Sequence, residues 1–345
     1  MQTWVVGVDL GGTKIATGLV DDRGQVIERL EQLTRPEQGP QTVIERMTQS
    51  VGEVCRRAGV RPGAVEAVTV ACPGPLDPAS GVVIAAPNLG WRHVDVVGPM
   101  QAALGVPVYL ENDANAAAFG EWWVGAGRGT RHFIYVTVST GIGGGIIIDG
   151  AIYGGAHWAA GEIGHTVIVV ENGPLCGCGR RGCLESVASG TGIARRAIEA
   201  LEEAGWREGE APEAADERPG ARLVRLAAGR FAEIDARKVA EAARQGDPLA
   251  KEVLDRTWLY LGAGLANLAN LFDPDAIAIG GGVSRIGEAM MEPLRRELRT
   301  RAVPGPAEGT RLVPALLGPN AGVVGAAAVA LKKLGKLEGV ESRAG

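Results

Sequence analysis

The sequence contains no concentration of positive charge. Its 345 residues include 35 Lys and Arg against 40 Asp and Glu, the formal net charge is −5, and no long run of Lys and Arg occurs. Proteins that bind nucleic acid neutralise phosphate groups with clustered cations. This charge balance therefore disfavours nucleic acid as a partner.

The sequence also lacks the usual signals for export and membrane insertion. The first residues lead directly into an apolar segment at Trp4, without a charged region or a cleavage site. There is no uninterrupted apolar stretch of about 18 residues, the length that a membrane-spanning helix needs. We therefore expect a cytoplasmic protein with no membrane partner.

Cysteine is scarce, whereas glycine is abundant. The five cysteines, an odd number, fit a reducing compartment in which Cys55 and Cys72 are free and buried. The 52 glycines provide many positions at which the backbone can turn sharply or approach a ligand. With 46% hydrophobic residues, a chain of this length can form the cores of two domains.

The other three cysteines lie close in sequence to a histidine. His165, Cys176, Cys178 and Cys183 offer three thiolates and one imidazole, the ligand set of a closed tetrahedral zinc site. Glycines between the cysteines let the backbone turn tightly. Because no position remains for water, we predict a structural rather than a catalytic zinc ion. The alternative is a disulfide or unrelated cysteines, which the Cys-X-Cys spacing disfavours because such pairs rarely bridge each other.

Two segments share a pattern of strand, glycine turn and strand. Residues 4–20 and 133–150 each contain two apolar runs joined by a glycine-rich turn, which predicts a hairpin in each and a duplicated lobe. The turn at residues 11–14 matches neither a Walker nor a Rossmann motif. Consecutive glycines nevertheless expose backbone amides to phosphate, so the turns at 11–14, 140–145 and 280–282 are candidates for holding a nucleotide. Taken singly, each turn is more often a plain hairpin.

The rest of the chain alternates helical and strand patterns, which indicates an α/β fold. Residues 204–233 are rich in Glu, Ala, Arg and Pro, and we expect an exposed excursion or helical insert there rather than core. Residues 338–345 are expected to fray. The predicted strands are residues 67–71, 106–110 and 276–279, and the predicted helices are residues 42–58, 97–104, 236–244, 248–271 and 323–334.

A polar stretch follows the strand predicted at residues 106–110. Residues 111–115 read Glu-Asn-Asp-Ala-Asn and lie at the edge where α/β folds place ligands. A carboxylate there can act as the general base of a phosphoryl transfer, and we assign that role to Asp113. The alternative is that Asp113 caps the helix that follows at residues 114–121.

These segments resemble the ROK family (repressor, open reading frame, kinase), and within it the ATP-dependent glucokinases. The resemblance covers most of the chain. The cysteine cluster through Glu185 and the stretch at residues 111–115 are specific, whereas the glycine turns are not. Residues 204–233 depart from the family pattern, because they look longer and more acidic. The other segments that carry the resemblance are residues 9–14, 72–75, 87–91, 139–144, 161–165 and 280–282.

The resemblance implies a two-lobed actin-like ATPase fold with ribonuclease H-like halves and an interlobe cleft. We expect a small α/β domain of residues 1–115, completed by a C-terminal helix at 322–335, and a large α/β domain of residues 116–321 that carries the zinc. The implied activity is phosphorylation of the 6-hydroxyl of glucose by Mg²⁺-ATP, a step of glycolysis. A homodimer or homotetramer is implied as well.

The resemblance also implies roles for individual residues. His165 would bind zinc through one ring nitrogen and a sugar hydroxyl through the other. Alternatively, Glu162 and Glu185 only face solvent and surround the zinc. The implied sugar contacts are Asn88, Asn112, Asp113, Glu162, His165 and Glu185, a mixture of donors and acceptors that suits hydroxyl groups. The implied nucleotide contacts are Asp9, which would orient hydrated Mg²⁺, with Gly11, Gly12, Thr13, Lys14, Thr140, Gly141, Gly281 and Gly282.

The family leaves alternative functions open. Kinases for fructose, allose, N-acetylmannosamine and N-acetylglucosamine use similar parts, and polyphosphate is an alternative phosphoryl donor. A sugar-responsive repressor is the alternative from a different class, and such repressors usually carry an N-terminal helix-turn-helix segment. Here the first predicted strand begins by Trp4 and the charge is acidic, so we expect a kinase.

Overall fold

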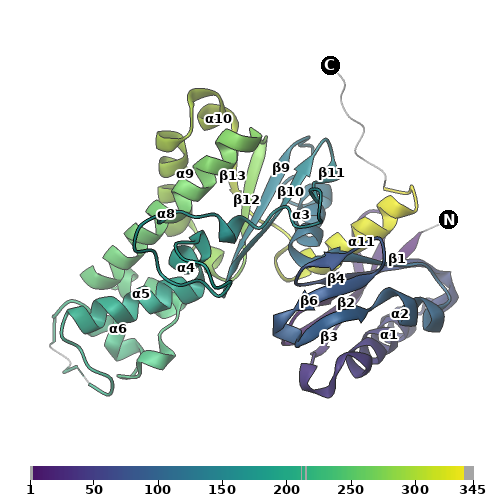
Figure 1. The fold of residues 1–345 in the computed structure, drawn as a ribbon, viewed down its shortest axis with the longest axis horizontal. Coiled ribbons are helices and arrows are strands. Elements are labelled where there is room, and N and C mark those ends of the chain that lie inside the picture. Colours follow the sequence, from purple (N-terminus) through teal and green to yellow (C-terminus); the bar gives the residue numbers. More distant parts are fainter. Residues whose placement is uncertain (1–2, 211, 214–215, 338–345) are drawn as a thin grey trace. The chain divides into compact units, whose positions relative to one another are not determined.

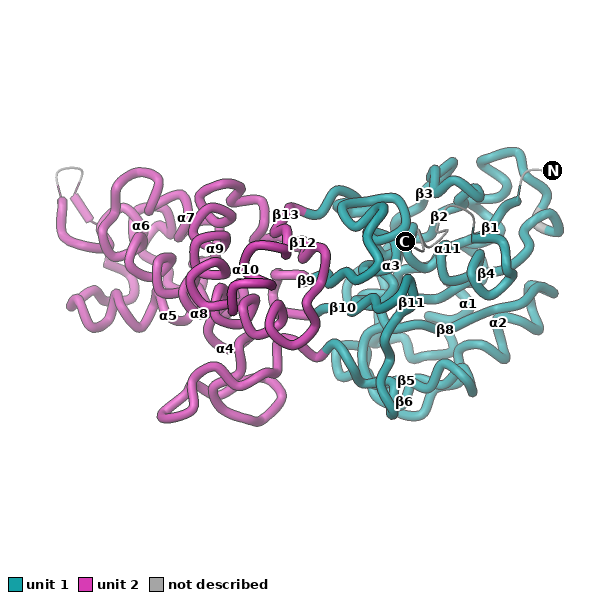
Figure 2. The backbone as a smooth tube through the Cα atoms, turned by 90° about the horizontal axis from the view of Figure 1, so that it is seen from above, with its two compact units in different colours: residues 1–135, 144–161, 315–345 teal, residues 136–143, 162–314 magenta. Residues whose placement is uncertain are grey.

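The computed structural model describes residues 3–210, 212–213 and 216–337. The chain divides into two compact units, shown in teal and magenta in Figure 2. Unit 1 comprises residues 1–135, 144–161 and 315–345, and unit 2 comprises residues 136–143 and 162–314. This division differs from the domain boundary expected at residue 115, which stays a prediction. The tail expected to fray lies outside the described residues.

Unit 1 is built on a five-stranded sheet whose central strand, β1, is buried on both faces. Val6 and Val8 belong to the same apolar cluster as Met47 of helix α1 (Pro40–Arg57). Positions along a strand alternate between its two faces, so Gly7 belongs to the opposite face, where it lies against helix α11 (Ala321–Lys333). The strand order is β3 (Val26–Leu33), β2 (Lys14–Asp21), β1 (Trp4–Leu10), β4 (Val65–Cys72) and β8 (Val108–Asn112). Figure 1 labels β1, β2, β3 and β4 of this sheet.

Two glycines let helix α11 pack closely on its neighbours. A Cβ atom at Gly7 would lie 2.0 Å from the carbonyl oxygen of Val323, and one at Gly325 would lie 1.7 Å from that of Ala116 in helix α3 (Asp113–Val124). No side chain fits at either distance, so only glycine permits this packing. Helix α11 thereby fixes the start of α3 relative to β1, and these two elements carry Asp113 and Asp9.

A second, three-stranded sheet in unit 1 was not anticipated from the sequence. It consists of β5 (Leu76–Asp77), β6 (Val82–Ala86) and β7 (Trp91–Asp95), which pair in antiparallel fashion. A short 3-10 turn between β6 and β7 carries Asn88. Trp91 is 2% exposed and belongs to the core of the unit, so it packs rather than facing a ligand.

The other five-stranded sheet has the same strand order as the first. In both sheets the third, second, first, fourth and fifth strands follow one another across the sheet. The hairpins predicted at residues 4–20 and 133–150 are therefore confirmed, and so is the duplication that they suggested. The strands are β11 (Ala151–Ile152), β10 (Ile142–Ile148), β9 (Phe133–Val138), β12 (Ala276–Gly280) and β13 (Arg311–Pro314).

The long helix α8 (Pro248–Phe272) is the central element of the helical part of unit 2. It contacts helices α4, α5, α7, α9 and α10. The helix predicted at 236–244 is α7 (Ala236–Arg244), and that predicted at 248–271 is α8, one residue longer. The remaining helices are α2 (Val97–Leu104) of unit 1, and α4 (Leu184–Ala188), α5 (Gly190–Glu203), α6 (Ala221–Leu226), α9 (Glu288–Arg301) and α10 (Pro304–Gly309) of unit 2.

The expectation for residues 204–233, an exposed excursion or helical insert rather than core, is met only in part. Most described residues from 204 to 219 are exposed and residues 221–226 are helical, but some side chains of the segment join the core. Trp206 is 2% exposed, and Leu223 is fully buried within helix α6. The cause is Asp247, the buried N-cap of α8, whose carboxylate also accepts hydrogen bonds from the backbone of Gly220 and Leu223. This carboxylate draws the segment onto the helical core. Among the described residues, no helix is long and apolar enough to cross a membrane.

Candidate functional site

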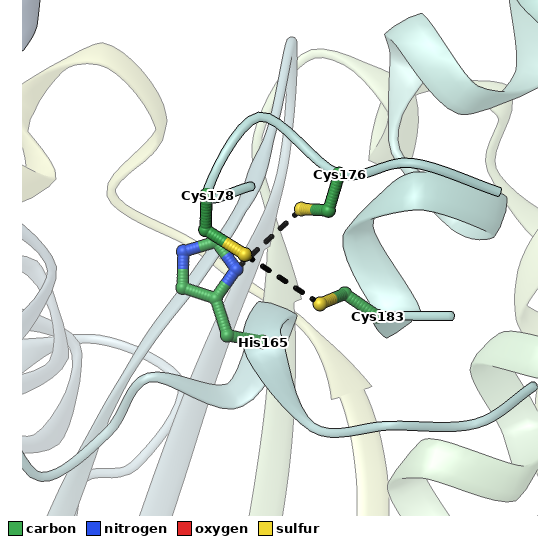
Figure 3. A group of neighbouring side chains, drawn as sticks. All are labelled: His165, Cys176, Cys178 and Cys183. Carbon is green, nitrogen blue, oxygen red and sulfur yellow. Dashed lines mark hydrogen bonds between the residues drawn. The ribbon is translucent and has the colours of Figure 1, made fainter. Parts of the chain in front are cut away.

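The three cysteines and the histidine meet in unit 2, as Figure 3 shows. Their ligand atoms all lie within 4.8 Å of one another. The Sγ atoms of Cys178 and Cys183 are 3.7 Å apart, and so are the Sγ of Cys176 and Nδ1 of His165. A tetrahedral site with zinc–sulfur bonds of about 2.3 Å has edges of about 3.8 Å. The side chains therefore fit a four-coordinate zinc ion.

The backbone around the cluster explains this convergence. Cys176 donates its N–H to the carbonyl of Arg180 at 2.8 Å, which closes a tight turn around Cys178. Gly182 has a φ of 75°, and a Cβ atom there would lie 1.8 Å from the carbonyl oxygen of Val169. All five cysteines are free, so the disulfide alternative is wrong, and Cys55 and Cys72 are buried as predicted.

Two carboxylates lie beside the cluster. Glu162 Oε2 is 3.8 Å from His165 Nε2, whereas the Nδ1 atom of the same ring faces Cys176. Glu185 Oε1 accepts a contact from the Cys176 thiol at 3.4 Å, and its Oε2 accepts a hydrogen bond from the backbone N–H of Ile142 at 2.9 Å. One ring nitrogen of His165 thus points at the metal position and the other points away from it. This is the arrangement that a histidine with two roles requires.

The start of helix α3 places Asp113 in unit 1. Asn112, not Asp113, is the N-cap, because its Oδ1 accepts the N–H groups of Ala114 at 3.0 Å and Asn115 at 3.1 Å. The alternative that Asp113 caps this helix is therefore wrong. Asn112 has the extended backbone of a cap residue, with φ −66° and ψ 142°, and Asp113 is the first helical residue. Its carboxylate is half-buried at the helix N-terminus.

Substitutions at Asn112 distinguish two roles of its side chain, the capping role of its oxygen and the donor role of its NH₂ group. Asn112→Ala should lower the free energy of unfolding by about 1 kcal/mol, because the N–H of Asn115 loses its acceptor and that of Ala114 keeps only Asp113 Oδ1. Asn112→Asp keeps an acceptor oxygen and should be close to wild type in stability. Both variants lose the amide donor proposed for the sugar. Urea unfolding curves measure the difference, and an Asp variant as unstable as the Ala variant would contradict the capping role.

Asp9 and Asp113 are electrostatically coupled. Burial, together with the negative charge of Asp113, raises the pKa of Asp9 to about 6, although Arg29 acts in the opposite direction. A Cβ atom at Gly322 would lie 2.4 Å from Asp9 Oδ2, so α11 closes over this carboxylate. Two acids close to each other provide oxygen ligands of the kind that a divalent cation prefers.

The first glycine turn lies beside these acids in the sequence and is held by local bonds. Gly11 donates to the carbonyl of Lys14 at 2.9 Å, and Thr34 Oγ1 donates to Gly11. Lys14, expected to face phosphate, forms an exposed ion pair with Glu31. A Cβ atom at Gly12 would lie 3.2 Å from Asn88, so an expected nucleotide position and an expected sugar contact adjoin. Thr13 is exposed.

Unit 2 contains a cavity of about 990 Å³ beside the other two glycine turns. Two of the expected nucleotide contacts, Thr140 and Gly282, line it. Gly281 has a φ of 85°, and a Cβ atom there would lie 2.3 Å from the carbonyl oxygen of Val138, so the turn needs glycine. Gly141 lies next to Thr140 but against Glu185 rather than in the cavity wall.

Most of the cavity wall was not predicted from the sequence. Helices α7 and α8 contribute Trp258 and several charged side chains, and Thr191 at the start of α5 adds a hydroxyl. The helical periodicity of α7 and α8 gave no signal that distinguishes cavity-facing from solvent-facing positions. The missed charged residues are Asp235, Arg237, Glu241, Arg244, Lys251, Asp255 and Arg285.

The expected site residues thus form three groups. Unit 1 brings Asp9 and Asp113 together and places Gly12 beside Asn88. Unit 2 holds the cysteine cluster with Glu162 and Glu185. It also holds the cavity with Thr140 and Gly282.

Comparison with known proteins connects these groups to one family. The ROK family model matches residues 5–333. The glucokinase of Thermotoga maritima is 36% identical over 334 residues, which are 96% of this chain and 98% of that protein. The structure of a ROK family glucokinase from Streptomyces griseus, in complex with glucose and AMPPNP, is 38% identical with a TM-score of 0.76, and the match covers 94% of this chain and 98% of that one.

A repressor is also similar to the chain. The xylose repressor of Caldicellulosiruptor bescii is 30% identical over 298 residues. This match covers 86% of the chain but only 70% of the repressor. The chain therefore matches almost all of the glucokinases and only part of the repressor.

Proposed function

The chain belongs to the ROK family, and from this membership we propose that it transfers the γ-phosphoryl group of ATP to the 6-hydroxyl of glucose. The observation that carries this function is the near full-length match to proteins named glucokinase, one of which binds glucose and an ATP analogue. The fold is the two-lobed actin-like ATPase fold expected from the sequence. The enzyme is an ATP-dependent glucokinase.

Asp113 is the proposed general base. It accepts the proton of the 6-hydroxyl as the sugar oxygen attacks the γ-phosphorus. It lies in the first turn of α3, where the positive end of the helix dipole attracts negative charge. The N-cap bonds of Asn112 hold this turn in place, so the base is positioned before substrate binds.

The proposed sugar contacts divide between the units. Asn88 and Asn112 of unit 1 carry amides, whereas Glu162, His165 and Glu185 of unit 2 carry two carboxylates and an imidazole. Together they offer donors and acceptors for several hydroxyl groups. The cysteine cluster supports this set because His165 and Glu185 both contact it.

The nucleotide is proposed to occupy the cavity of unit 2. Trp258 provides apolar surface, and Thr140, Gly282 and the residues beside them provide polar backbone. The phosphates are proposed to face Gly141, Gly281 and the first glycine turn, which comprises Gly11, Gly12, Thr13 and Lys14. Asp9 would orient hydrated Mg²⁺ through water, and the ion would supply positive charge that neutralises the phosphates.

The raised pKa of Asp9 predicts how Mg²⁺ binding depends on pH. Below about pH 6 the carboxylate becomes protonated and loses its attraction for the cation. The Mg²⁺ concentration that half-saturates AMPPNP binding should rise about tenfold per pH unit below this value and stay flat above it. Calorimetric titrations between about pH 5 and pH 8 measure this dependence. Asp9→Asn should require high Mg²⁺ at every pH, and a wild-type requirement that does not change with pH would contradict the role.

Zinc is the proposed occupant of the cysteine cluster, because the ligand set and spacing suit a tetrahedral ion. We also propose that the protein works in the cytoplasm, where its free thiols stay reduced. A homodimer or homotetramer is proposed from two exposed apolar side chains, Leu271 and Val303, in unit 2. Asn270 joins their segments by a hydrogen bond to the N–H of Val303. Light scattering measures the assembly.

A coupled ADP-release assay tests the function. We expect glucose to give the highest kcat/KM in a panel that includes mannose, fructose, allose, N-acetylglucosamine and N-acetylmannosamine. A parallel series with polyphosphate tests the donor, because a glucomannokinase from Arthrobacter that uses polyphosphate or ATP is 26% identical with a TM-score of 0.59. A faster reaction with an N-acetylhexosamine would overturn the assignment of glucose.

A further inference from the structure

The turn at residues 139–142 lies between the cysteine cluster and the cavity of unit 2. Ser139 and Thr140 line the cavity at one end of the turn. At the other end, Ile142 donates its backbone N–H to Glu185 Oε2 at 2.9 Å. A Cβ atom at Gly141 would lie 2.4 Å from the same oxygen. The turn therefore packs directly on the carboxylate of Glu185.

Glu185 also lies next to the metal ligands. Glu185 follows Cys183 by two residues, and its Oε1 is 3.4 Å from Cys176 Sγ. Gly164, the neighbour of His165, packs on the carbonyl of Ile142, where a Cβ atom would lie 2.1 Å from the oxygen. Residues next to metal ligands thus meet both the N–H and the carbonyl of Ile142.

The cavity side of the turn is tied to the same stretch of chain. Gly190 donates its N–H to the carbonyl of Ser139 at 2.7 Å, and Thr191 Oγ1 donates to that of Thr140 at 2.8 Å. Gly190 and Thr191 line the cavity as well. One short segment, from Cys183 to Thr191, therefore begins at the metal cluster, bonds to the turn through three of its residues and ends in the cavity wall.

We propose that Glu185 is a positioning residue that couples the metal cluster to nucleotide binding by fixing the 139–142 turn. This role is separate from the sugar contact proposed for Glu185, because Oε2 is committed to Ile142 and only Oε1 remains for a hydroxyl. The inference rests on the proposed function in taking the cavity as the nucleotide site. Coupling between two binding equilibria is reciprocal, so the nucleotide must tighten the metal as much as the metal tightens the nucleotide.

Calorimetric titration with AMPPNP, without sugar, tests the role of Glu185 in the zinc-loaded protein. Glu185→Ala should weaken nucleotide binding by about 5- to 20-fold, within the usual range of coupling between sites. Glu185→Gln keeps an oxygen that accepts from Ile142 and should restore most of the affinity. The matched control is Glu171→Ala, which removes an exposed carboxylate between His165 and Cys176 that has no proposed role in binding, and it should bind AMPPNP as wild type does.

Amide hydrogen exchange gives a readout that is independent of catalysis. The N–H of Ile142 should exchange faster in Glu185→Ala and in metal-stripped wild type, and at the wild-type rate in Glu185→Gln and Glu171→Ala. In wild type, competition with a chromophoric chelator should show zinc bound about 5- to 20-fold more tightly with AMPPNP present. This factor should fall to one in Glu185→Ala.

The outcomes separate the inference from the proposed function. Equal AMPPNP affinity in wild type and Glu185→Ala, with zinc affinity unaffected by nucleotide, would overturn the coupling and leave the glucokinase intact. No AMPPNP binding by wild type would overturn the nucleotide site, and exchange at Ile142 would still decide whether the cluster holds the turn. If Glu185→Ala does not fold, the chelator competition on wild type decides the coupling alone.

Discussion

Asp113→Asn is expected to lower kcat by about 10²- to 10⁴-fold, the contribution typical of a positioned general base. The amide is similar in size to the carboxylate, and it cannot accept the proton of the 6-hydroxyl. Glucose binding should be largely unchanged, because the amide oxygen can still accept a hydrogen bond from a sugar hydroxyl. The effect should therefore appear in kcat and not in the dissociation constant of glucose, which calorimetry measures separately.

The matched control for this variant is Asp113→Glu. It keeps a carboxylate at the helix N-terminus but moves it by one methylene, so its kcat should lie between those of Asp113→Asn and wild type. The two thermal midpoints should be similar, because Asn112 rather than Asp113 supplies the capping oxygen. A kcat near that of wild type in Asp113→Asn would remove Asp113 from the catalytic role.

The sequence predicts those parts of the site whose signal is local. The cysteine cluster is confined to residues 165–183, so the spacing alone indicates a tetrahedral set, and the ligand atoms converge as expected. The two hairpins are local as well, because each needs only a glycine turn between apolar runs. Both features depend on neighbours in the chain, which a sequence displays directly.

The features that the sequence does not predict depend on distant contacts or on backbone angles. Whether Asn112 or Asp113 caps α3 is decided by φ and ψ at one residue, and both side chains are good caps. The cavity wall combines faces of α7 and α8 with a turn more than 90 residues earlier in the chain, as the positions of Thr140 and Trp258 show. Asp247 holds the backbone near Gly220 through hydrogen bonds of its side chain, and such bonds leave no periodic pattern in the sequence.

Removal of the bound metal is expected to destabilise unit 2 and to weaken glucose binding together. A structural zinc ion contributes directly to folding energy, and a loss of about 3 kcal/mol or more would lower the thermal midpoint by roughly 10 °C. Glucose binding should fall because the metal orients the His165 ring, whose Nε2 faces Glu162 and the proposed sugar. Differential scanning calorimetry and glucose titration before and after chelation measure both effects.

Cysteine variants distinguish loss of the metal from damage by the chelator. Cys178→Ser removes an exposed ligand without opening the core, so it should lose zinc and reproduce the effects of chelation. Cys55→Ser changes a buried cysteine that belongs to the core of unit 1 and to no metal set, so it should keep one zinc ion per chain and its sensitivity to chelation. A wild-type protein that contains no zinc and still binds glucose at full strength would show that the cluster holds no structural metal. His165 and Glu185 both adjoin the cluster and are proposed to contact the sugar. Loss of glucose affinity without loss of stability would therefore show that the metal orients these two side chains and does not stabilise the fold.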